Sequence, residues 1–140
     1  MIVRRPTGLV YWRAYRAGQL LWSERGSNLV VDAAAGSLAR IAAGVGSVTS
    51  IAIGTNGTAP AGGDTALTAS FVRPILSAQS PSTGVARFNW RIFAAEMPTM
   101  TAREIGLLDD QGTLIARKVW STPQSLELGI ELDGDWSLTF

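Results

Sequence analysis

Alternating apolar and polar positions over residues 103–120, REIGLLDDQGTLIARKVW, predict two short strands that fold back on each other. Ile105 and Leu107 mark the first arm, and residues 109–112 supply a polar turn. The return arm carries its apolar residues at Leu114, Ala116 and Val119. A hairpin alone is at most marginally stable in water, so we expect this one to belong to a larger sheet.

A second β-hairpin is predicted over residues 8–25, with its turn at Ala17-Gly18. Alternation places three residues on one face, namely Val10, Trp12 and Ala14, and four on the other, namely Leu9, Tyr11, Arg13 and Tyr15. Because both faces carry large apolar groups, the hairpin lies either inside the fold or with one face against a partner. Aromatic residues and arginine are typical of interface hot spots. The candidate partner contacts are Tyr11, Trp12, Arg13, Tyr15 and Trp22.

After this hairpin the apolar residues recur at the spacing of a helix. Gly26-Ser27-Asn28 offers an N-cap for a helix over about residues 28–43, which Gly44 and Gly46 end. Asp32 falls near its positive end. One stripe at helical spacing contains Val31, Ala34, Leu38, Ile41 and Ala42. Since the stripe is rich in alanine, we expect the helix to lie close against the sheet and to cover it.

The remaining pattern predicts more strands. The predicted strands lie at 48–53, 71–78, 84–94, 125–132 and 136–140, with a glycine-rich loop at 54–64 and a turn at 79–83 pairing 71–78 with 84–94. We expect Asp133-Gly134-Asp135 to form a turn or bulge and Phe140 to be paired. The predicted fold is mainly β: an antiparallel β-sandwich-like domain with one packed α-helix at about residues 28–43.

The amino-acid composition says more about the function of the protein than about its fold. The 140 residues suit a single domain, and no stretch has the length of a signal peptide or a membrane span. Charged residues make up only 16% of the chain, against a typical 25% or so, and only one of the twelve basic residues is lysine. Arginine is enriched and lysine depleted at protein interfaces. This bias indicates a subunit of an assembly, with a GC-rich genome as the alternative explanation.

The charges divide along the chain. Residues 1–91 hold nine arginines and three acids, whereas 92–140 hold eight acids and three basic residues, so +6 and −5 give the net charge of +1. We expect these charges to pair within one fold, with head-to-tail contact between copies as the alternative. The near-neutral total argues against nucleic acid as the main partner.

Catalytic chemistry has few candidates here, since the chain has neither histidine nor cysteine. Asp109-Asp110 and Asp133/Asp135 fall at predicted turns, where aspartate typically bonds to the backbone; a calcium site at either turn is the alternative. Glu104 beside Arg103 indicates a structural or solvated ion pair. Neither Gly44-Val45-Gly46 nor the 54–64 loop has the context of a nucleotide or phosphate site. We therefore predict no catalytic, cofactor or metal site.

Several segments in a fixed order resemble a known family. They are NLVVDAAAGSLARIAAG, VTSIAIGTNGTAPAGGDTALTASFVRPI, VARFNWRIFAAE and TAREIGLLDDQGTLIARKVW, within residues 28–122. Together they resemble the N-terminal baseplate-attachment domain of bacteriophage tail-fibre proteins, the P2-like fibre family and related small tail proteins. On this resemblance, 28–122 is the attachment-like core of a single 1–140 domain, with 1–27 as an added hairpin and 123–140 as closing strands.

The resemblance implies a non-enzymatic virion protein at the tail tip, made in the host cytoplasm, that joins fibres or other adhesion parts to the baseplate. Its expected partners are tail, baseplate or fibre proteins and copies of itself, most often as a trimer, with no cofactor, nucleic acid or membrane insertion. Two departures are that this chain stops at Phe140 and that hairpin 8–25 lies outside the pattern. Rival functions are a capsid decoration protein, a carbohydrate-binding module using Trp12, Trp22 and Trp90, and, least favoured, a small hydrolase using Glu104, Asp109 or Asp110.

Overall fold

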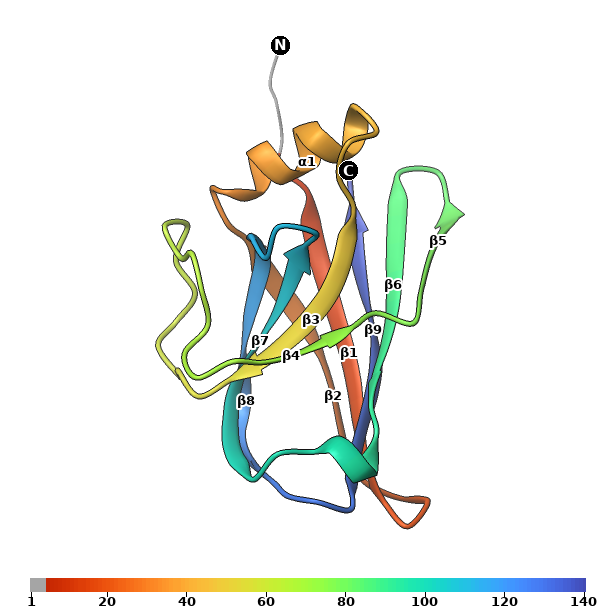
Figure 1. The fold of residues 1–140 in the computed structure, drawn as a ribbon, viewed down its shortest axis with the longest axis vertical. Helices are drawn as coiled ribbons and strands as arrows, with labels where there is room; N and C mark the ends of the chain where they lie inside the picture. The colour runs from red at the N-terminus through yellow and green to blue at the C-terminus, as the bar shows by residue number, and fades with distance from the viewer. Residues whose placement is uncertain (1–4) are drawn as a thin grey trace.

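The computed structural model describes residues 5–140, which form a mainly β fold with one α-helix (Figure 1). The elements in chain order are β1 (Thr7–Arg16), β2 (Gln19–Val30), α1 (Ala34–Ala42), β3 (Val48–Gly54), β4 (Phe71–Pro74), β5 (Ser77–Ser82), β6 (Val85–Ile92), the 3₁₀ turn η1 (Ala94–Glu96), β7 (Met100–Asp109), β8 (Leu114–Leu126) and β9 (Ile130–Thr139). Both predicted hairpins are present, as β1–β2 and β7–β8.

The strands form one antiparallel order, β4-β3-β7-β8-β2-β1-β9-β6-β5, that curls into two layers packed face to face. Layer A contains β5, β6, β9, β1 and most of β2, and layer B contains β4, β3, β7 and β8. Strand β2 joins the layers, because it pairs with β1 over most of its length but with β8 only at Leu29 and Val30. The predicted mainly β, sandwich-like class is confirmed.

Hairpin β1–β2 is an integral part of this sandwich. Strand β1 pairs with β2 on one side and with β9 along its whole length on the other. Its inner residues Val10, Trp12 and Ala14 are at most 1% exposed and join a core that both layers supply. Residues 8–25 are therefore built into layer A, in which β1 lies between β2 and β9.

The chain from β4 to β5 crosses between the layers on the side opposite β2. Strand β4 pairs with β3 and β5 pairs with β6, so the single predicted strand 71–78 is divided between the layers. Ile75 and Leu76 bridge the gap by donating backbone hydrogen bonds to Thr49 O and Asn89 O, at 2.9 and 2.7 Å. The predicted turn at 79–83 is also wrong: β5 runs to Ser82, and the turn falls at the following two residues.

The helix begins later than predicted, at Ala34 rather than near residue 28. Residues 28–30 are strand instead, since Asn28 pairs with Gly8, and Leu29 and Val30 pair with β8. Pairing on both sides outweighs the local capping signal of Ser27 and Asn28. Helix α1 lies across one end of the two layers, so it closes that end and does not cover a sheet face (Figure 1).

The tail forms one long strand where a turn was predicted. Asp133-Gly134-Asp135 lies inside β9, paired to β1 and to β6. Gly134 fits there because a Cβ would overlap the Tyr11 carbonyl oxygen and lie 2.9 Å from the Trp90 ring. The turn comes earlier, where Ile130 N bonds Glu127 O at 3.1 Å. Phe140 is paired as predicted, through a 2.8 Å bond from its N–H to Gly84 O.

Candidate interaction surfaces

The outer face of layer A carries a cluster of tyrosine and arginine side chains, which we call the Tyr–Arg face: Tyr11, Arg13, Tyr15 and Arg25. The Arg13 guanidinium lies 5.5 Å from the Tyr11 ring centre and 5.8 Å from that of Tyr15, and Arg25 lies 5.2 Å from Tyr11. All three predicted contacts Tyr11, Arg13 and Tyr15 are partly exposed here. Rings held by cations present large, preorganised contact surfaces.

Ion pairs between the two halves of the sequence cross this face. Arg13 Nε lies 2.8 Å from Asp133, and Arg91 Nη2 lies 2.7 Å from Glu131. The hydrogen bond to Asp133 raises the pKa of Arg13 above its ordinary value. Among the described residues, the other arginines of 1–91 that pair with acids of 92–140 are Arg16 with Glu127, Arg40 with Asp109 and Asp110, and Arg73 with Glu96. Pairing within one fold, the favoured explanation of the divided charge, is therefore what the structure contains.

The other two predicted contacts, Trp12 and Trp22, lie on the opposite, inner side of the hairpin. Trp12 is 1% exposed, so it is a core residue and not a surface contact. Its ring stacks on Trp120 at 4.5 Å between centres and meets the edge of Trp22, which is half-buried, at 3.6 Å. Trp90 is also 1% exposed. Of the three tryptophans suggested as sugar platforms, only Trp22 reaches the surface.

A buried ion pair lies beneath the glycine-rich loop. Arg117 and Glu104, 1% and 0% exposed, approach to 2.8 Å between Nε and Oε1. Glu104 was expected to pair with its neighbour Arg103, but its position on the loop side of β7 directs it to Arg117 on β8. A buried pair is stable only when its other polar atoms are also satisfied.

The loop supplies the remaining partners of that pair. Glu104 Oε2 accepts backbone hydrogen bonds from Asn56 at 2.8 Å and Thr68 at 2.9 Å, one near each end of the loop. Arg117 donates to three loop groups: Asn56 O at 3.0 Å, Thr58 O at 2.9 Å and Asp64 Oδ2 at 3.0 Å. We call this network the loop staple. It holds residues 55–68 against β3, β7 and β8, so the loop is a fixed part of the surface.

The turn of β7–β8 anchors the helix through its two aspartates. Burial alone raises the pKa of Asp109, but hydrogen bonds from Ser37 and from the backbone of Thr113 and Gln111 outweigh it, so that pKa lies below its ordinary value. The hydrogen bond from Arg40 lowers the pKa of Asp110. The interpretation of Asp109 as a backbone-bonding turn residue is confirmed.

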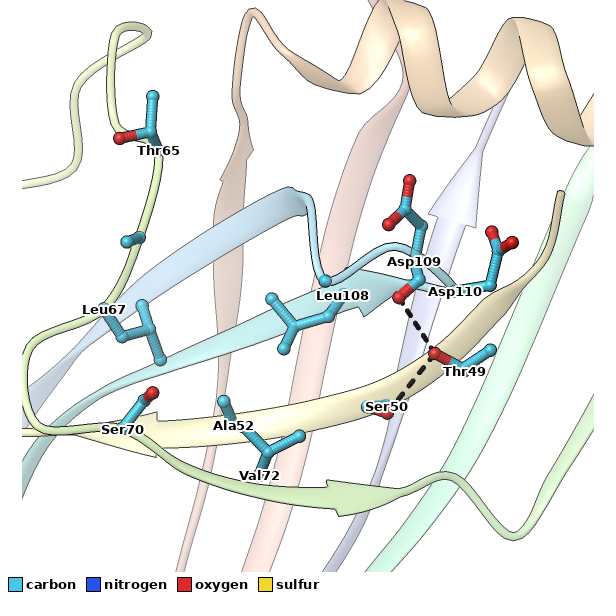
Figure 2. Close-up of a pocket in the computed structure, with 12 residues that line it drawn as sticks. Thr49, Ser50, Ala52, Thr65, Leu67, Ser70, Val72, Leu108, Asp109 and Asp110 are labelled. Atoms are coloured by element: carbon cyan, nitrogen blue, oxygen red, sulfur yellow. Dashed lines mark hydrogen bonds between the residues drawn. The ribbon is translucent and has the colours of Figure 1, made fainter.

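A shallow pocket of about 340 Å³ lies between this turn, β3 and the loop (Figure 2). Leu67, Leu108 and Val72 supply apolar lining, and Thr49 and Ser50 line the side nearest Asp109 and Asp110 (Figure 2). The carboxylates of Asp109 and Asp110 point out of the pocket, toward α1, where Ser37 and Arg40 hold them (Figure 2). The pocket therefore presents hydroxyls and apolar groups, and no free acid faces it.

The acidic pairs also lack the arrangement of a metal site. Within residues 5–140, no three side chains of the kinds that bind metals come together. Asp133 and Asp135 lie in the middle of β9 and not at a turn, and Asp133 is bound to Arg13. Among residues 5–140, the longest helix is α1, with nine residues, and no helix has the length and apolarity needed to cross a bilayer.

Comparison with known proteins adds no relative: no family model, curated protein or solved structure matches this chain.

Proposed function

We propose that this protein is a non-enzymatic structural component of a tailed-phage virion, located at the tail tip or baseplate, where it joins fibres or adhesion parts to the tail. The observation that carries the proposal is where the family-like segments lie. Residues 51–55, 60–67, 104–107 and 110–116 are scattered in sequence, yet they form one unit of layer B, with the loop staple linking the loop to β7 and β8. This shared location supports the proposal, because all four segments belong to one local structure.

The Tyr–Arg face supplies the proposed docking surface. It lies on the outer side of layer A, whereas the family-like unit lies in layer B, so the protein has two separate surfaces for two neighbours. Its partly exposed aromatic and arginine groups match the composition of interface hot spots. We place the adaptor contacts at Tyr11, Arg13 and Tyr15, and copies of the chain, as a trimer, are included among the proposed neighbours.

Incorporation into particles tests this proposal. A triple variant, Tyr11→Ser, Arg13→Ser and Tyr15→Ser, changes partly exposed side chains and is expected to keep the fold, as circular dichroism would verify. We expect it to be lost from particles purified from a complemented lysate. The matched control, Ser80→Ala and Ser82→Ala on the exposed strand β5 at the far edge of layer A, should be incorporated normally. Normal incorporation of the folded triple variant would refute docking through this face.

A further inference from the structure

The two layers separate on the side where β2 and β8 diverge. These strands pair only at Leu29 and Val30, and farther from α1 they move apart (Figure 1). This leaves an opening between the layers, which we call the β2–β8 seam. A pocket of about 280 Å³ lies in it, lined by Trp12, Trp22, Ser23, Glu24, Ser121, Thr122 and Gln124.

Polar side chains stand in the seam on the core side of the sandwich. Trp12 is the direct cross-strand partner of Glu24, and Ala14 is that of Trp22, so all four side chains project to the same inner face. An ordinary sandwich edge carries apolar residues at such positions. Here a carboxylate, a carboxamide and hydroxyls surround a floor of indole rings.

The seam is poorly suited to a peptide strand. Glu24 Oε1 already accepts the Ser121 backbone N–H at 3.3 Å, in the place where an added strand would bond. Pro123, two residues along the same edge of β8, has no N–H to donate. Both features oppose pairing of an added strand along this edge of β8, and the pocket has the dimensions of a small-molecule site.

We propose that the seam pocket binds one neutral hexose unit, either as a free glycoside or at the end of a glycan. A sugar ring has an apolar face of C–H groups that fits the Trp22 indole, and hydroxyls at its rim that both donate and accept. The Glu24 carboxylate can accept hydrogen bonds from these hydroxyls, and the Gln124 carboxamide can both donate to them and accept from them. The pocket volume of about 280 Å³ lies just below the roughly 300–1,000 Å³ range of small-ligand sites, so it suits no more than a single ring.

The tryptophan cluster has unused hydrogen-bonding capacity. The indole N–H of Trp12, a residue that lines the pocket, is buried and finds no acceptor among the described residues; Trp90 and Trp120, which do not line it, have unpaired indole N–H groups as well. Buried donors in proteins are nearly always paired, so the Trp12 N–H is a candidate donor to a sugar oxygen. The negative charge of Glu24 further selects neutral sugars over uronic acids.

NMR titration of the whole chain tests the proposal. The probes are the methyl glycosides of glucose, galactose, mannose and N-acetylglucosamine, with methyl glucuronide as the charged comparison. We expect saturable shifts of the Trp12 and Trp22 indole N–H signals with at least one neutral glycoside and a dissociation constant of about 1 mM, typical of one small ring. The Trp136 indole, bonded to Asn28 in the core, should stay still. Oligosaccharides ending in the same sugar show whether a glycan binds better than the free ring.

Two variants separate binding from folding. Gln124→Ala and Glu24→Gln keep the tryptophan cluster and should weaken binding about tenfold and about threefold, while Tyr11→Ala, on the outer face of the same hairpin, should leave it unchanged. Glu24→Gln should also reduce the preference for the neutral sugar over the glucuronide. The proposal is overturned if the folded protein shows no saturable shift with any glycoside up to about 20 mM, a twentyfold excess over that constant. Binding that survives both seam substitutions would overturn it as well.

Discussion

Replacing Arg117 by methionine should strongly destabilise the protein and free the glycine-rich loop. The change removes the guanidinium that contacts Glu104, Asp64 and two loop carbonyls, while the apolar stem is kept. Glu104 then stays buried without its counter-charge. Breaking a buried pair from one side costs about 3–5 kcal/mol. For a domain of this length, near 3 °C per kcal/mol, the melting temperature should fall by about 10–15 °C.

Urea unfolding followed by tryptophan fluorescence measures the free energy, and amide hydrogen exchange reports on the loop. We expect faster exchange at Asn56 and Thr68, whose N–H groups bond Glu104. Arg16→Met is the matched control, since its pair with Glu127 is exposed and contributes less than about 1 kcal/mol. A loss below about 1 kcal/mol for Arg117→Met would refute the loop staple as a source of stability.

A double-mutant cycle identifies the origin of the cost. Adding Glu104→Leu to Arg117→Met removes the orphaned carboxylate, so the double variant should be more stable than the sum of the single changes by about 1–3 kcal/mol. The loop amides should exchange rapidly in the double variant as well as in Arg117→Met, because the introduced leucine side chain offers them no acceptor. Simple additivity would mean that the two charges act independently, contrary to their 2.8 Å contact.

Three further predictions address the turn and the strands. The pKa of Asp109 is lower in the folded protein than in the unfolded chain, so the unfolded chain binds a proton at this carboxylate more tightly. The stability that Asp109 contributes is therefore full above about pH 4 and is lost as the pH falls through the folded pKa. Asp109→Asn should flatten this acid dependence of the unfolding free energy, measured by urea titration at several pH values. Gly134→Ala should cost more than about 2 kcal/mol in thermal unfolding, because its Cβ would overlap backbone. Gly63→Ala, where a Cβ meets nothing within 4 Å, should change the melting temperature little; equal effects of the two alanines would contradict the packing of β9 against β1.

The sequence predicted local hairpins better than it predicted long-range pairing. Hairpins 8–25 and 103–120 follow from alternation and nearby turn residues, so they were found. The start of α1 was missed because Asn28 is fixed by β1 and the two residues after it by β8, which no local signal reveals. Gly134 suggested a turn, but it serves close packing between β9 and β1.

The candidate surfaces were predicted in part. The alternating pattern of β1 places Trp12 on the face opposite Tyr11, Arg13 and Tyr15. If only one face of the strand had been assigned to a partner, Trp12 would have been assigned to the core. The loop staple was missed, although opposite charges on facing arms of a predicted hairpin are a usable signal. The seam could not be predicted, since it depends on where β2 leaves β8.

Localisation in particles tests the central claim most directly. Antibody raised against the recombinant chain, used for immunogold electron microscopy of particles from a producing lysate, should label the tail tip, and mass spectrometry of the purified particles should detect the chain. Label over the head would instead indicate a decoration protein. Absence of the chain from particles would contradict the virion role altogether.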